Sequence, residues 1–154
     1  MAEPRPDTLH LDDYLPYRLS VASNRVSRLI AKLYQDRFGL SIWQWRVLAI
    51  LGAQTGLTAG QVATRAAMDK MAVSRAVSAL LTRGLVVRET AKHDARARIL
   101  SLSETGAGIY AEIAPLARRQ EQQLLADFRP EDIAAGTKFL KALEKQAAML
   151  AGDA

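Results

Sequence analysis

The chain has 154 residues, of which 49% are hydrophobic, and this length suits one folded domain with a buried core. Its 21 Lys and Arg residues outnumber its 16 Asp and Glu residues, and the resulting formal net charge of +5 favours a polyanionic partner. The absence of cysteine excludes disulfides, thiolate metal sites and thiol-based redox sensing. No stretch resembles a secretion signal or a membrane span, so we expect a cytoplasmic protein.

A long amphipathic helix is predicted from Tyr14 to Phe38. Pro16 fits only the first turn of such a helix, and Gly39 is suited to end it. The apolar residues recur at alternating intervals of four and three, at Leu15, Leu19, Ala22, Val26, Leu29 and Leu33. This helix is longer than a small domain needs to cover its own core, so we expect part of its apolar side to contact something else.

A second helix is predicted to start at a Ser41 cap and to run to about Leu51. Trp45, Leu48 and Leu51 point inward in this interpretation. Gly52 is expected to end the helix.

Two short helices follow, in the pattern of a helix-turn-helix. The first spans Leu57 to Met68 with Thr58 as its N-cap, and the second spans Asp69 to Gly84 with Asp69 as its N-cap. One side of the second helix is apolar, and the other side carries small polar residues and an arginine with almost no acid: Met71, Ser74, Arg75, Ser78 and Thr82. Such a face suits the approach to phosphates and base edges, although an ordinary solvated helix would also fit.

A β-hairpin is predicted after these helices. The runs Leu85 to Thr90 and Arg96 to Leu102 favour strands, and the polar segment of residues 91–95 joins them. A helix-turn-helix followed by a basic hairpin is a winged helix-turn-helix.

The C-terminal part is predicted to form two more helices. Ser103 caps the first, which contains Pro115, and the last begins near Pro130. In the last helix an apolar seam again repeats at intervals of four and three: Ile133, Gly136, Leu140, Leu143, Ala147 and Leu150. The terminal helices could pack on each other within one chain or on a second subunit.

The motifs resemble those of the MarR family of bacterial transcription regulators. The resemblance lies in LSIWQWRVLAIL (residues 40–51), LTAGQVATRAAMDKMAVSRAVSALLTRGLV (residues 57–86) and DARARILSLSETG (residues 94–106). The last string contains the family's Asp-x-Arg wing motif at Asp94 and Arg96. Two differences concern the reading region: residues 66–68 lack the glycine often found in the turn, and Met71-Ala72 replaces a small polar pair.

The resemblance implies a mainly α fold, a winged helix-turn-helix with long N- and C-terminal dimerisation helices. Residues 1–154 would form a single MarR-like domain, with dimerisation helices at about 11–38 and 104–150 and the winged helix-turn-helix at about 40–102. The implied protein is a homodimer that binds double-stranded DNA at a pseudo-palindromic operator. Two recognition helices would then enter successive major grooves.

The candidate DNA-binding residues come from the helix-turn-helix and the wing: Thr58, Lys70, Met71, Ser74, Arg75, Ser78, Arg88, Asp94, Arg96 and Arg98. In the family motif Arg96 is the residue inserted into the minor groove, where negative potential is concentrated. Asp94 would accept a hydrogen bond from Arg96 and hold its guanidinium in one pose.

Aromatic and cationic residues near the first two helices suggest a second site. Family members bind phenolic or aromatic carboxylate effectors between the dimer helices and the winged domain. The resemblance therefore favours a small aromatic acid or its thioester as effector. The candidate ligand-binding residues are Tyr17, Arg18, Trp43 and Arg46. These aromatic residues could equally belong to a core or a subunit interface.

No catalytic pair and no cofactor motif is found. The two histidines, His10 and His93, have no metal-ligand spacing, and no phosphate-binding loop is present. We therefore expect a DNA-binding regulator, most simply an effector-released repressor, and no enzyme, metal or cofactor. A constitutive or architectural DNA binder remains an alternative, as does a small helical ligand-binding protein or enzyme.

Overall fold

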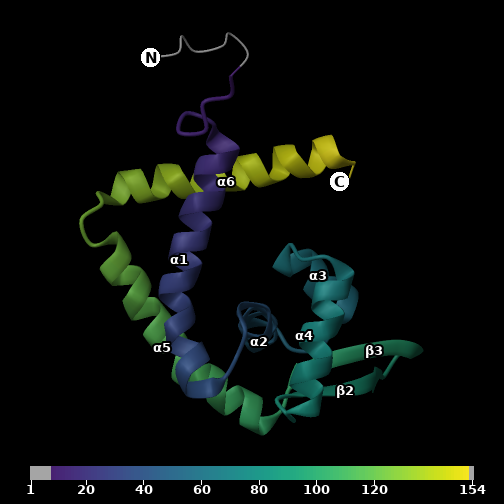
Figure 1. Ribbon diagram of the computed structural model, residues 1–154. Coiled ribbons are helices and arrows are strands. Elements are labelled where there is room, and N and C mark those ends of the chain that lie inside the picture. Colours follow the sequence, from purple (N-terminus) through teal and green to yellow (C-terminus); the bar gives the residue numbers. More distant parts are fainter. Residues whose placement is uncertain (1–7, 153–154) are drawn as a thin grey trace. The chain divides into compact units, whose positions relative to one another are not determined.

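The computed structural model describes residues 8–152 (Figure 1). The chain divides into two compact units, the first up to Ala117 and the second from Arg118. The described residues form helices and a small antiparallel sheet, so the predicted mainly α class with a β wing is confirmed. Within residues 8–152, no helix combines the length and the apolar character needed to cross a membrane.

Helix α1 (Leu15–Phe38) has the predicted extent. Tyr14 is its N-cap residue, and Pro16 lies in the first turn, where its missing N–H removes no intrahelical hydrogen bond. Gly39 ends the helix with a φ of 60°, a left-handed conformation that glycine adopts without a Cβ clash. Only the C-terminal half is well covered, because Ala31 and Tyr34 are its buried residues.

Helix α2 (Ile42–Ala53) begins with a capping box. The Ser41 side chain accepts a hydrogen bond from the Gln44 N–H at 3.1 Å, and the Gln44 side chain accepts one from the Ser41 N–H at 3.1 Å. The prediction that Gly52 ends this helix is wrong, because Gly52 lies inside it. A Cβ at Gly52 would lie 2.7 Å from the Tyr110 ring, so a close helix contact accounts for this glycine.

Helices α3 (Ala59–Ala66) and α4 (Lys70–Thr82) form the predicted helix-turn-helix. Thr58 caps α3 in a capping box with Gln61, and the Asp69 side chain accepts a hydrogen bond from the Ala72 N–H at 2.8 Å. Ala67 in the turn has a φ of 49°, the left-handed conformation for which a glycine is more usual. Ala67 therefore adopts this conformation at the cost of local backbone strain, and the turn forms without the glycine.

The sheet has three antiparallel strands in the order β1-β3-β2. Strand β1 (Leu57–Thr58) pairs with β3 (Asp94–Leu102), which also pairs with β2 (Val86–Ala91). Strand β1 was not predicted, because two residues carry no periodicity. The predicted connection over residues 91–95 is too long: Ala91 and Asp94 already belong to strands, and the turn is Lys92-His93.

The core of the first unit lies among α2, α3, α4 and the sheet. It is built from aliphatic side chains that include Val47, Leu48, Leu51, Val62, Val73, Val77, Leu80, Leu100 and Ile113. Burial of each such side chain contributes about 1.5–3 kcal/mol. This core fixes the outer face of α4 relative to the hairpin.

Helix α5 (Glu104–Leu125) begins at Ser103, whose hydroxyl oxygen accepts a hydrogen bond from the Gly106 N–H at 3.0 Å. The predicted cap is therefore confirmed, and Pro115 lies inside the helix as predicted. Tyr110 of α5 contacts Trp45 of α2, with ring centroids 6.2 Å apart.

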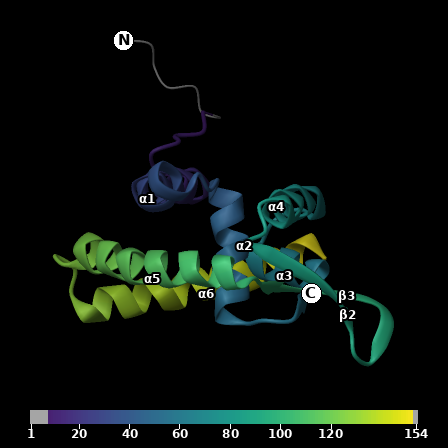
Figure 2. The same cartoon turned by 90° about the horizontal axis from the view of Figure 1, so that it is seen from below.

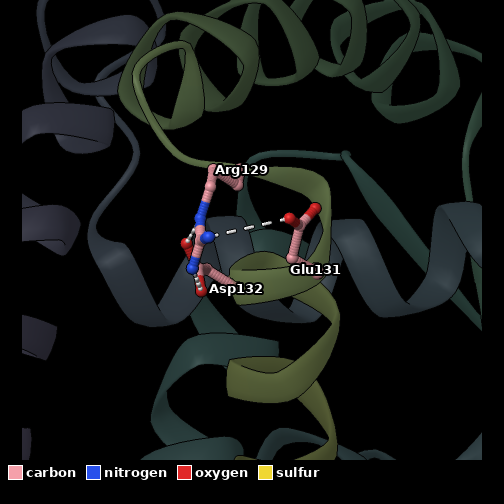
Figure 3. A network of polar contacts seen from close by, with 3 residues as sticks. All are labelled: Arg129, Glu131 and Asp132. Carbon is pink, nitrogen blue, oxygen red and sulfur yellow. Dashed lines mark hydrogen bonds and ion pairs between the residues drawn. The ribbon is translucent and has the colours of Figure 1, made fainter.

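The second unit contains helix α6 (Pro130–Ala151), for which a start near Pro130 was predicted. The Arg129 guanidinium donates to the Asp132 carboxylate at 2.7 and 2.9 Å and lies 3.8 Å from Glu131 (Figure 3). The hydrogen bond to Asp132 raises the pKa of Arg129 above its ordinary value. None of the residues of α6 is buried.

Candidate nucleic-acid interface

The outer face of α4 is polar and open to solvent. Val73, Ala76, Val77 and Leu80 are buried on one side of the helix. The opposite side is exposed and carries Met71, Ser74, Arg75, Ser78 and Thr82. Met71 has an exposed fraction of 66%, unusually high for a large apolar side chain and consistent with a contact surface. The division of α4 into a core face and an outer face is as predicted.

A hollow lies beside α4 on the side of the hairpin; we call it the wing-side hollow. Its volume is about 180 Å³, and it is lined by Lys70 and Ser74 of α4, Arg88 of β2 and the start of α3 at Ala59 and Gly60. The fold thus brings together three residues that were predicted separately. Two cations and a hydroxyl around one hollow suit a phosphate group. Thr58, the fourth candidate in this region, is the N-cap of α3 and directly precedes Ala59 in the sequence.

A second hollow lies along the other flank of α4; we call it the α2-side hollow. Its volume is about 130 Å³, and Trp43 and Arg75 face it from α2 and α4. Ala72 and Ala76 form its α4 side, and Ser41 and Gln44 complete the lining. Trp43, with an exposed fraction of 45%, is therefore placed beside α4.

The β2–β3 hairpin projects away from α4 in both views of the molecule (Figures 1 and 2). The Asp94 carboxylate accepts a hydrogen bond from the backbone N–H of Arg96 at 2.9 Å. The expected partner was the Arg96 guanidinium, whereas the bond observed goes to the backbone of the same residue, at the start of β3 where its register with β2 shifts. The contact of Asp94 with the guanidinium stays a prediction. The Arg98 guanidinium donates to the Thr90 hydroxyl across the strands, and Arg96 is exposed near the tip.

The four predicted ligand-binding residues form two separate pairs. Tyr17 and Arg18 lie at the start of α1, and 21 residues of helix, about 31 Å, separate Tyr17 from Phe38. From Phe38 to Trp43 the chain can reach at most about 18 Å. Within one chain the Cα atoms of Tyr17 and Trp43 are therefore at least about 13 Å apart, and a single site formed by these four residues stays a prediction.

Arg46 has partners of its own. Its guanidinium lies 5.3 Å from the centre of the Trp43 ring and donates to the Ala66 carbonyl at 3.4 Å. It thereby supports the end of α3 and the left-handed turn at Ala67. Burial raises the pKa of the Tyr34 phenol, and the nearby Arg46 charge partly offsets the effect. Tyr34 stacks on Trp45 at 5.6 Å, so this tryptophan is part of the packing between α1, α2 and α5.

Another hollow, which the sequence interpretation missed, lies along α1; we call it the α1 hollow. It has a volume of about 450 Å³ and is lined by Asn24, Ser27, Arg28, Ala31, Gln35 and Ile42. The α1 members recur at helical spacing, and a search for a polar stripe on this helix would have found them. The candidate ligand residues predicted from the sequence are aromatic residues and neighbouring arginines, and none of them lines this hollow.

Helices α3 and α4, the projecting hairpin and the cations around the outer face of α4 define a winged helix-turn-helix DNA-binding protein. Residues 38–97 match the family model described as the MarR family. The chain is 32% identical to an uncharacterised HTH-type transcriptional regulator, YwoH, of Bacillus subtilis over 71% of this chain and 81% of that protein.

Solved structures agree with this relationship. A MarR family transcriptional regulator from Silicibacter pomeroyi is 29% identical and has a TM-score of 0.72 over 90% of this chain and 91% of that one. BpsR of Bordetella bronchiseptica, 21% identical, has a TM-score of 0.79 over 89% of this chain and 97% of that one and shows the same fold. The chain belongs to the MarR family and is a transcription regulator of that type, without enzymatic activity. Members of the family bind DNA as dimers, and some bind small-molecule ligands.

Proposed function

We propose that this protein is a homodimeric repressor that binds a pseudo-palindromic operator and is released by a small aromatic acid or its thioester. The observation that carries the DNA-binding part is the pair of hollows on opposite flanks of α4, one with Lys70 and Arg88 and the other with the polar residues Ser41 and Gln44. When a helix enters the major groove, the two sugar-phosphate strands run along its flanks. The hollows would therefore receive phosphates of the two strands.

The outer face of α4 would read the bases between these strands. Arg75 can donate two hydrogen bonds to a guanine, and Ser74 and Ser78 can bond to several base edges. Met71 offers an apolar contact that suits a thymine methyl group. Arg96 at the hairpin tip would reach into the adjacent minor groove, held by the backbone turn that Asp94 stabilises.

The dimer would form through the terminal helices, so that residues 1–154 act as one MarR-like domain with the dimerisation and winged regions predicted above. The support is the exposed apolar side chains on α1 and in the second unit. They include Leu15, Tyr17 and Leu29 on α1 and Phe128, Phe139, Leu140, Met149 and Leu150 in the second unit. Exposure of so many large apolar groups in a monomer would be costly, and a second copy of the chain would cover them.

The α1 hollow is the best-supported position for an effector. Arg28 can pair with a carboxylate, Asn24, Ser27 and Gln35 can bond to ring hydroxyls, and Ala31 and Ile42 provide apolar contact. The DNA binding of BpsR, which shares this fold, is regulated by 6-hydroxynicotinic acid. An acid of that chemical class fits the lining of the α1 hollow.

Release would follow from a shift between two dimer geometries. An effector that binds the non-operator geometry 10- to 100-fold more tightly supplies about 1.4–2.7 kcal/mol toward release. A protein that leaves its operator when the effector binds is most simply a repressor. A constitutive DNA binder would share the outer face of α4 but would show no ligand response.

Selection of binding sequences from a random duplex pool tests the proposal. We expect an enriched sequence with two inverted half-sites about one helical turn apart and a strong decrease of affinity with salt. Sedimentation should give twice the chain mass of 16.9 kDa at micromolar concentration. Enrichment of a single half-site by a monomer would contradict the dimeric model, and absence of any enrichment would contradict sequence-specific binding.

A further inference from the structure

The C-terminal end of the recognition helix is held by α5 on one side. The Ser103 hydroxyl donates to the Gly84 carbonyl at 2.6 Å, and the Ser103 N–H donates to the Leu85 carbonyl at 3.0 Å. A Cβ on Gly106 would lie 1.9 Å from the Leu85 oxygen, so the two backbones touch. This contact leaves no room for sliding and can serve as a pivot for α4.

On another side the same end is joined to α1 by Arg83, the C-cap residue of α4. The Arg83 guanidinium donates to the Phe38 carbonyl at 2.6 Å and to the Gly39 carbonyl at 3.2 Å. Carbonyls at the end of a helix lack intrahelical donors and carry partial negative charge, so a cation is well placed there. The Arg83 contact is polar and exposed, unlike the close backbone contact with α5.

The end of α1 is also joined to α5, independently of α4. Arg37 pairs with Glu112 at 2.5 Å. The two arginines therefore have different roles at one helix end: Arg37 ties α1 to α5, and Arg83 ties α1 to the recognition helix. Substitution of Arg83 breaks the link between α1 and α4, whereas substitution of Arg37 removes an equal charge and loosens α1 from α5. A comparison of the two variants therefore isolates the effect of the α1–α4 link.

We propose that Arg83 is a positioning residue that fixes the angle of α4 relative to α1 and thereby sets the half-site spacing that the dimer accepts. The inference rests on the proposed function, in which α1 belongs to the dimer interface and each α4 enters a major groove. One inserted base pair displaces the second half-site by about 3.4 Å and rotates it by about 35°. The core packs α4 against α2 and α3, so α4 turns only together with them. With Arg83 bonded to the end of α1, these helices cannot follow that change, whereas without this bond they can turn about the α5 contact.

The test compares wild-type protein, Arg83→Ala, Arg83→Lys and the matched control Arg37→Ala. Fluorescence anisotropy would measure their affinities for the selected operator and for duplexes with one base pair added or removed between the half-sites. Wild type and Arg37→Ala should lose at least about 10-fold in affinity on the altered duplexes, and Arg83→Ala about 3-fold or less. Arg83→Lys should retain part of the discrimination, because an ammonium group can donate to one of the two carbonyls.

Salt dependence separates positioning from direct phosphate contact. Since Arg83 bonds to protein carbonyls, Arg83→Ala should keep the wild-type slope of log affinity against log salt. A slope lower by about one unit per subunit would overturn the proposal in favour of a phosphate contact. So would wild-type spacing discrimination in an Arg83→Ala protein that is folded by circular dichroism. If Arg83→Ala does not fold, Arg83→Gln replaces it under the same criteria.

The outcomes distinguish this proposal from the proposed function. If wild type itself binds no two-half-site operator, or accepts all spacings equally, the dimeric operator model fails and the role of Arg83 fails with it. If wild type discriminates and Arg83→Ala discriminates equally, the role of Arg83 fails and the operator model stands.

Discussion

Trp43 and Arg75 line the same hollow, although one belongs to α2 and the other to the outer face of α4. The indole is thus next to a residue proposed to read DNA, and Arg46 stacks on it from α2 at 5.3 Å. Trp45 lies two residues further on and packs between the rings of Tyr34 and Tyr110. The two tryptophans therefore have different surroundings and should report on different events.

We predict that Trp43 fluorescence responds to DNA. In a Trp45→Phe variant, operator DNA should change the emission of Trp43, because a strand that occupies the α2-side hollow alters its solvent contact. The Trp43→Phe variant is the matched control and should respond little, since Trp45 is packed between α1, α2 and α5. An unchanged Trp43 emission at saturating DNA would place the strand elsewhere.

Gly106 and Gly108 provide a matched pair for stability. Gly106→Ala places a methyl group against the Leu85 carbonyl, and we expect a loss of about 1–3 kcal/mol or more in the free energy of unfolding. Nothing lies within 4 Å of a Cβ on Gly108, also in the first turns of α5, so Gly108→Ala should be neutral or stabilise by up to about 1 kcal/mol. Denaturant unfolding measures both, and equal effects would contradict the close packing at Leu85.

Much of the fold was predictable because its signals are local. The caps Thr58 and Asp69 and the stop at Gly39 depend on side-chain and backbone chemistry within a few residues, and all three have the predicted roles. Gly52 was misinterpreted for the complementary reason. Gly52 has an ordinary helical conformation, and a glycine is needed there because the ring of Tyr110, which is distant in sequence, lies close to it.

The candidate sites depend more strongly on tertiary structure. Lys70, Ser74 and Arg88 were proposed one by one, and only the packing of β2 beside α4 shows that they share a hollow. The candidate ligand residues were grouped by residue type, which says nothing about position along a rigid helix, and most of the length of α1 lies between Tyr17 and Trp43. The bond from the Arg96 backbone to Asp94 likewise lies where the register of β2 and β3 shifts, an irregularity that the alternation of residue types does not reveal.

For the wing, we predict that substitutions of Asp94 act through its role as an acceptor. Arg96→Ala should lower operator affinity by about 1–3 kcal/mol and reduce the salt slope by about one unit per subunit. Asp94→Ala should have a smaller effect, because it releases the backbone turn and keeps the arginine. Asp94→Asn retains an oxygen for the Arg96 N–H and should bind at least as well as wild type, as measured by anisotropy titration; weak binding by Asp94→Asn would indicate that the charge itself is required.

Arg75 and Lys70 are predicted to differ in what they recognise. Arg75→Ala should reduce the preference for specific over random duplex, with a cost of about 1–3 kcal/mol at one position of each half-site. Lys70→Ala should lower the affinity for both duplexes to a similar extent, because a phosphate contact does not depend on the base sequence. Competition titrations with systematic base substitutions measure this difference. Equal losses on both duplexes for Arg75→Ala would move that residue to a backbone role.

The effector prediction separates Arg28 from Arg18. Hydroxylated benzoic and nicotinic acids should release wild-type protein from its operator, and Arg28→Ala should respond at least about 10-fold more weakly because the α1 hollow loses its carboxylate partner. Arg18→Ala removes an equal charge from the first turn of α1, outside the lining of the α1 hollow, and should respond as wild type. The measurement is DNA release against acid concentration. The reverse pattern would place the ligand near Tyr17, at the start of α1. If no acid or thioester of the panel releases DNA, the effector proposal fails and the evidence for DNA binding is unaffected.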